Sequence, residues 1–200
     1  MIMDTPHLVR AVLIGLGATL LIDLWALFLR RAFGIPSLNY CLLGRWVLSM
    51  PEGKLVHESI GTSPGKPHEC PVGWTTHYLI GTALALLFVL LASGSWLERP
   101  TLLPALAFGI ATVLVPFLTM QPAFGLGVAA SKTPHPNRVR LKSLTTHTVF
   151  GLGLYLWAYL LSHVGFRPAA KVAGRERKRT SWCWEAGPVR ARTAENRDPK

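Results

Sequence analysis

Charged residues are scarce in this chain, and no established reaction motif interrupts its apolar stretches. Only 16% of the 200 residues are charged, while 50% are hydrophobic; soluble domains usually carry about 25% charged residues. Three cysteines give no disulfide framework. Cys41 and Cys70 share one predicted loop and would pair only in an oxidising compartment, so we interpret them as free thiols. The composition favours a membrane protein over a soluble enzyme.

Four apolar runs dominate what is present. They predict helices at about residues 8–29, 73–96, 101–119 and 143–165. At about 1.5 Å rise per residue, each run can cross a hydrocarbon core of about 30 Å. A bilayer requires backbone polar groups to be satisfied within the segment, which favours helices. The sequence therefore predicts an all-α membrane protein with four transmembrane helices.

Two of these helices have closely similar sequences. TTHYLIGTALALL (75–87) and TTHTVFGLGLYLW (145–157) are identical at six of thirteen positions, seventy residues apart. The segments Ala18–Asp23 and Ala111–Pro116 are related more weakly, in the same order. This predicts two tandem helical hairpins related by a pseudo-twofold axis along the membrane normal.

The segments between and after the helices have their own patterns. Residues 40–50 place apolar side chains on one helical stripe with Arg45 and Trp46 as anchors, which predicts a short interfacial helix. Pro116 should kink or break the third helix. The chain then divides into a transmembrane domain, residues 1–166, and a basic tail, residues 167–200, which we predict to be disordered or lipid-associated.

Uncommon polar residues collect at the membrane face that carries both long loops. Asp23 is predicted inside the first helix, and His77 and His147 begin the second and fourth. An intramembrane carboxylate is costly and marks a candidate functional site. Small residues at a spacing of four should let these helices approach and bring the three residues together. The full predicted cluster is Asp23, His77, His147, Thr19, Gln121 and Tyr155, with a loop-side group of Asn39, Arg45, His57, Asn137 and Arg138.

Three functions are compatible with this cluster. In the first, Asp23, His77 and His147 are interhelical hydrogen-bond glue in a structural or assembly protein. In the second, they line a polar cavity that binds a proton, ion or small solute in a transporter or channel-like component. In the third, they hold a metal or act as acid and base in a membrane-embedded enzyme. The sequence favours the second as a function, assigns no catalytic residue and predicts no cofactor.

The formal charge of +11 is divided between the loops and the tail. Residues 167–200 contain ten Lys and Arg, and the two loops contain nine. Basic groups beside membrane helices predict contact with anionic lipid headgroups rather than nucleic acid. By the positive-inside rule, the basic residues of the two loops predict that the loops are cytoplasmic. The basic residues of the tail instead favour a cytoplasmic tail, with the loops on the opposite side. We also expect a homo-oligomer in a bacterial inner membrane.

Several stretches together resemble one bacterial membrane family, the domain-of-unknown-function family 2938. The matching stretches, in order, are GLGATLLIDLWALFLRRAFGIPSLNY (15–40), GRW (44–46), HESI (57–60), HYLIG (77–81), RPTLLPAL (99–106), the MQP at 120–122 and SLTTH (143–147). The resemblance covers about residues 8–165 and excludes the tail. It implies a four-helix membrane protein and no particular activity.

Overall fold

The protein is built on long apolar helices. The computed structural model describes residues 5–92 and 94–164, and no strand occurs among them. Four helical segments are long and apolar enough to cross a membrane: α1 (Thr5–Phe33), α3 (Glu69–Ala92), the segment Leu102–Ala123, and α7 (Pro136–His163). The predicted all-α class with four such helices is confirmed. The predicted tail lies outside the described residues.

The third segment is interrupted, as Pro116 predicts. It consists of α5 (Leu102–Ala111), the π-helical turn η2 (Pro116–Met120) and α6 (Gln121–Ala123). The other short elements are α2 (Tyr40–Ser49), η1 (Met50–Glu52), α4 (Gly94–Glu98) and η3 (Val128–Ala130). Proline lacks the amide proton that would continue the regular hydrogen-bond ladder, and π-turns of this kind are frequent at functional sites.

Three helices begin earlier than the sequence predicts, and the first of them, α1, starts at Thr5 rather than at about residue 8. α3 starts at Glu69 rather than at residue 73, and α7 starts at Pro136 rather than at residue 143. Proline is tolerated in the first helical turn, where its missing N–H would have no intrahelical partner. Pro71 and Pro136 therefore lie in the first turns of α3 and α7, ahead of the residues at which the sequence predicts these helices to begin.

Small residues set the contacts between the helices. α1 buries Ala11, Ile14, Ala18 and Thr19, a stripe at helical spacing, against α3 and α7. The core cluster also takes in Phe88 and Val89 of α3, together with Phe150, Leu154 and Ala158 of α7. Many leucines instead face outward, as expected for lipid-facing surfaces: Leu20, Leu24, Leu79, Leu91, Leu103, Leu114 and Leu160 are all more than two-fifths exposed.

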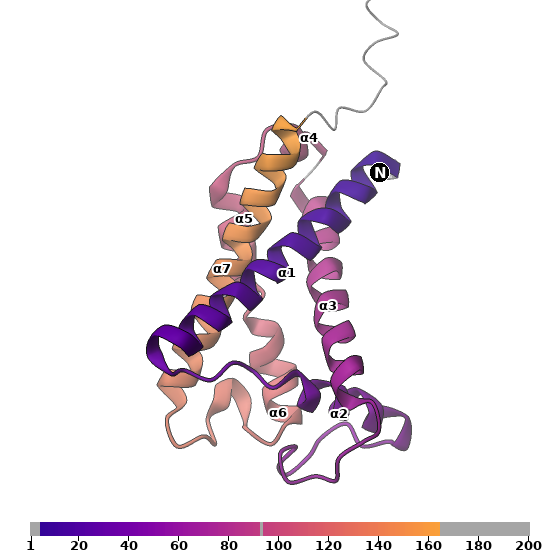
Figure 1. The fold of residues 1–200 in the computed structure, drawn as a ribbon, viewed down its shortest axis with the longest axis vertical. Coiled ribbons are helices and arrows are strands. Elements are labelled where there is room, and N and C mark those ends of the chain that lie inside the picture. Colours follow the sequence, from indigo (N-terminus) through magenta and orange to yellow (C-terminus); the bar gives the residue numbers. More distant parts are fainter. Residues whose placement is uncertain (1–4, 93, 165–200) are drawn as a thin grey trace, which may run out of the picture. The chain divides into compact units, whose positions relative to one another are not determined.

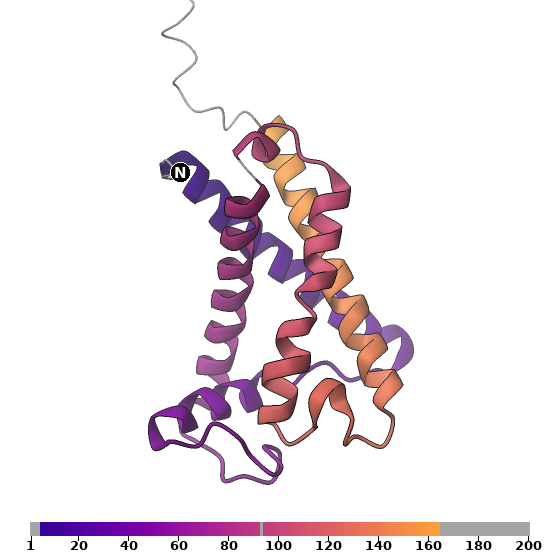
Figure 2. The same cartoon turned by 180° about the vertical axis from the view of Figure 1, so that it is seen from behind.

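The helices are unevenly paired. α1 packs against both α3 and α7, and α5 packs against α7, whereas α3 and α5 barely touch. Figures 1 and 2 show α2 and both long loops at the end of the molecule opposite the first residues of α1, with α2 lying across the start of α3. The tandem-hairpin symmetry and the interfacial position of α2 stay predictions.

Candidate functional site

The carboxylate of Asp23 joins three elements at the loop-side end. Its Oδ1 accepts from the Tyr40 hydroxyl at 3.3 Å and lies 3.1 Å from Nε2 of His77, and its Oδ2 accepts from the Tyr78 hydroxyl at 2.8 Å. Because a carboxylate only accepts hydrogen bonds, we assign Nε2 of His77 as the third donor to Asp23. The Tyr40 ring stacks on His77 with centroids 4.1 Å apart. Burial, followed by the Asp23 charge, raises the pKa of the Tyr40 hydroxyl.

Tyr40 is held there by a close crossing of α2 with α3. A Cβ at Gly44 would overlap the Glu69 carbonyl, and one at Gly73 would overlap the Tyr40 carbonyl. These glycines follow Cys41 and Cys70 by three residues, so the backbone approach brings the two cysteines onto facing turns. Their Cα atoms lie 3.9 Å apart, and the two form a disulfide.

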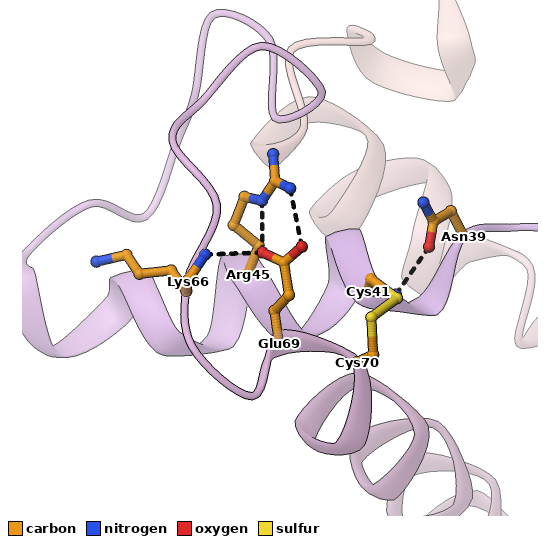
Figure 3. The surroundings of a disulfide bond; sticks show 6 residues. All are labelled: Asn39, Cys41, Arg45, Lys66, Glu69 and Cys70. Atoms are coloured by element: carbon orange, nitrogen blue, oxygen red, sulfur yellow. Dashed lines mark hydrogen bonds and ion pairs between the residues drawn. A yellow bond between two sulfur atoms is a disulfide. The ribbon is translucent and has the colours of Figure 1, made fainter.

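The disulfide corrects the expectation of free thiols. That expectation considered the compartment and the number of cysteines, and overlooked the small residues that let α2 and α3 touch. Figure 3 shows the bond between Cys41 and Cys70 beside an ion pair, formed by Arg45 and Glu69, that also joins α2 to α3. Arg45 donates from Nε and Nη2 to both carboxylate oxygens of Glu69, at 2.8 and 2.9 Å, and from Nη1 to the Ile60 and Ser63 carbonyls. The bond to Glu69 raises the pKa of Arg45.

His147 does not join Asp23, contrary to the sequence prediction. Its Nδ1 instead lies 2.8 Å from Oγ1 of Thr112, which is buried on the neighbouring helical segment. Thr112 donates its only hydroxyl proton to the Gly109 carbonyl at 2.5 Å. We therefore assign Nδ1 of His147 as the donor to Thr112, and in that tautomer Nε2 is an acceptor. The polar residues form two groups rather than one.

A cavity of about 450 Å³ lies between these groups. That volume falls within the range of small-molecule sites, about 300–1,000 Å³. Apolar side chains make most of the wall, including Ile22, Leu84 and Phe150, and Ile35 to Leu38 carry it to the loop end. The polar side chains along it are Thr19, Ser37, Tyr40, His77, Thr119, Gln121, Lys142, Ser143, Thr146 and His147.

Gln121 occupies a special position in this wall. Its side chain is 3% exposed, its Nε2 lies 3.4 Å from Oγ of Ser143, and its Oε1 has no hydrogen-bond partner. A buried polar atom without a partner destabilises the fold by about 1–3 kcal/mol. The interruption at Pro116 places this residue at the start of α6, facing the cavity.

Of the remaining predicted residues, Thr19 lies in the cavity wall, whereas Tyr155 and Asn39 lie outside it. Thr19 donates to the Gly15 carbonyl and packs against Gly81. Tyr155 lies away from the cavity, with its ring 5.9 Å from that of Tyr159. Asn39 caps α2 by accepting from the Cys41 amide, 3.0 Å away.

The loop-side residues likewise lie apart from the cavity wall. The amide of His57 donates to the Ala123 carbonyl, while its buried Nδ1 has no partner. Asn137 accepts from Arg140 at 3.2 Å, and Arg138 is exposed. Arg45, on α2, is held by its ion pair with Glu69. None of the five loop-side residues lines the cavity.

Three contributors to the two groups were not predicted: Tyr40, Tyr78 and Thr112. The repeat contained a signal for Thr112, because it aligns with Thr19. Tyr78 directly follows His77, but nothing in the sequence indicates that Tyr40 folds back from the loop. Among residues 5–92 and 94–164, no group of three or more His, Cys, Asp or Glu side chains could hold a metal ion. The arrangement can bind a small molecule, and no metal centre is visible in these residues.

Comparison with known proteins identifies the family. Residues 12–161, from the first turns of α1 to the last turn of α7, match the family described as protein of unknown function, DUF2938. No curated protein and no solved structure matches the chain. The match covers most of the chain and the residues of both polar groups, and the chain therefore belongs to the DUF2938 family.

Proposed function

We propose that this membrane protein is a small transporter or channel-like component that binds a solute in the cavity between its helices. The observation that carries the proposal is the unsatisfied Oε1 of Gln121, which is buried in the cavity wall. Helical bundles place ligand sites between facing helices. Discontinuous helices, such as the one broken at Pro116, are common at transporter binding sites.

A second candidate is a structural or assembly protein, and Asp23 favours it. Each of its oxygens is hydrogen-bonded, and its partners come from α2 and α3. Interhelical hydrogen bonds of this kind stabilise membrane bundles by about 0.6–2 kcal/mol each. We therefore assign Asp23 and His77 a mainly structural part, and assign solute binding to Gln121 and His147. The metal-dependent enzyme has no supporting observation among the described residues.

The disulfide bears on the orientation in a bacterial inner membrane. Cysteine pairs persist in oxidising compartments and are rare in the cytosol. Cys41 and Cys70 lie at the loop side, so we propose that both long loops face the oxidising side. This orientation agrees with the positive-inside rule applied to the ten Lys and Arg in the sequence of residues 167–200. This reverses the orientation that the loop charges predict. Contacts with anionic headgroups, and a homo-oligomer, remain part of the proposal.

The proposal is tested by the access of water to the cavity. Ile22 lines the cavity, whereas Leu24 is 53% exposed on the outer surface of α1. Ile22 and Leu24 flank Asp23 in α1, so they lie at nearly the same depth. Each is replaced by cysteine in a chain that also carries Cys183→Ser, which removes the third native cysteine. A membrane-impermeant maleimide is applied from each side in turn.

We expect Ile22→Cys to be labelled from the loop side and Leu24→Cys to remain unlabelled in lipid. The side of the membrane from which Ile22→Cys is labelled is the side on which the loops and the Cys41–Cys70 disulfide lie. We expect it to be the oxidising side. Absence of labelling at Ile22→Cys in folded protein would show a dry cavity and overturn the transport proposal in favour of the structural one.

A further inference from the structure

The cavity wall offers mostly hydrogen-bond acceptors, a bias that defines what it can bind. The inference rests on the proposed solute cavity and concerns the chemical class of its occupant. Three hydroxyls along the wall have already donated their proton to their own helix. Thr19 donates to Gly15, Thr119 to Val115 and Thr146 to Lys142. A hydroxyl has a single proton, so these groups have none left for a ligand.

Two acceptors of the wall lie on α6 and α7, one on each. Oε1 of Gln121 has no partner, although the side chain is 3% exposed. Nε2 of His147 is the acceptor left over when Nδ1 donates to Thr112. An occupant that supplies a proton at this level would satisfy an atom that is otherwise buried unpaired.

The donors differ in position. Lys142 bonds the Pro36 carbonyl near the loop end. Ser143 lies beside Gln121, and its Oγ accepts from Nε2 of that residue at 3.4 Å, which leaves the serine proton available. A group beside Gln121 can therefore donate to Oε1 and accept from Ser143. A hydroxyl does both, whereas an ether, a ketone or a hydrocarbon cannot donate.

We infer that the cavity binds an apolar molecule bearing a hydroxyl group, with the hydroxyl donating to Gln121 and the apolar body against Ile22, Leu84 and Phe150. The volume of about 450 Å³ suits a molecule of moderate size. The apolar wall matches a solute that partitions into the bilayer, so the ligand class is a lipid-soluble alcohol or phenol rather than an inorganic ion.

The test uses a matched pair of probes on the full chain in lipid nanodiscs. One is a diazirine-bearing octanol, and the other is its methyl ether, which has the same chain and no donor. Each is photolysed over a range of concentrations, and mass spectrometry measures the labelling of peptides that contain cavity residues. Gln121→Leu removes the acceptor at nearly constant size. Thr148→Val is the control, because Thr148 lies on α7 outside the cavity wall and its hydroxyl donates to the Leu144 carbonyl of its own helix.

We expect the alkanol to half-saturate the cavity at a concentration about three- to tenfold lower than the ether, the ratio that one net hydrogen bond supports. Gln121→Leu should raise the alkanol value to that of the ether and leave the ether unchanged, and Thr148→Val should change neither. Equal values for the two probes in the natural chain would overturn the hydroxyl assignment alone. Absence of saturable cavity labelling by either probe would overturn both this inference and the proposed solute cavity.

Discussion

The two predicted repeats place similar residues in different chemical situations. In the first, His77 faces Asp23, and the carboxylate is surrounded by donors from α2 and α3. In the second, the position that aligns with Asp23 is Pro116, so His147 turns to Thr112 instead. In the first repeat, hydrogen bonds and a disulfide join the neighbouring helices. In the second repeat, the helix that contains Pro116 is interrupted. The comparison assigns a mainly stabilising part to Asp23 and His77 of the first predicted repeat, and solute binding to Gln121 and His147 of the second.

The largest expected loss of stability comes from replacing Asp23 in the first repeat. Asp23→Leu removes all the bonds from Tyr40, Tyr78 and His77 and leaves these donors unpaired. At about 0.6–2 kcal/mol for each interhelical bond, the free energy of unfolding should fall by about 2–5 kcal/mol. Reversible unfolding in mixed detergent micelles measures it. Leu24→Ala on the lipid-facing side is the control, and a loss no greater than in that control would remove the structural assignment of Asp23.

The disulfide provides the next largest difference between the repeats. Reduction of Cys41–Cys70, or the pair Cys41→Ser and Cys70→Ser, should lower stability by about 2–4 kcal/mol, because the bond closes a loop between residues 29 apart. Hydrogen exchange should increase in α2 and the start of α3 and remain unchanged in α7. Equal increases in α3 and α7 would show that the effect of the disulfide is not confined to the first predicted repeat.

A smaller effect distinguishes the two equivalent glycines, Gly81 and Gly151. A Cβ at Gly81 would lie 2.0 Å from Oγ1 of Thr19, which is a side-chain atom, whereas one at Gly151 would lie 2.7 Å from the Ala105 carbonyl oxygen, which is a backbone atom. Backbone yields less than a side chain, so Gly151→Ala should be destabilised by about 1–3 kcal/mol, the usual range for overpacking, and by more than Gly81→Ala. Thermal unfolding of both variants in one detergent gives the order, and the reverse order would contradict the packing described here.

Hydropathy and residue spacing predicted the four helices and the meeting of Asp23 with His77. They did not predict the partner of His147, which depends on how the helices pack. The apolar runs required four helices, and the shared faces of Asp23 and His77 predicted their meeting. His147 was placed wrongly because α7 packs on α1 further along, where Gly153 approaches Ala18, while the turn that holds His147 packs on α5 beside Gly109. The alignment of Pro116 with Asp23 was visible in the sequence and already indicated that the second repeat has no carboxylate.

The disulfide and the cavity were less accessible to sequence reasoning. The pairing of Cys41 with Cys70 depends on Gly44 and Gly73, whose close approach is a property of two helices in contact. The missing partner of Gln121 depends on hydrogen bonds made elsewhere in the wall. Neither is encoded in a local pattern, although both glycines follow their cysteines at the same spacing.

The most direct test of the division between the repeats is the free energy of unfolding of Gln121→Leu. If Gln121 serves a ligand and not the fold, removing its unpaired Oε1 should leave stability unchanged or raise it by about 1 kcal/mol in the absence of ligand. The same measurement on Asp23→Asn should show a loss. A clear destabilisation of Gln121→Leu would show that Gln121 supports the fold, and would contradict the assignment of binding to the second repeat.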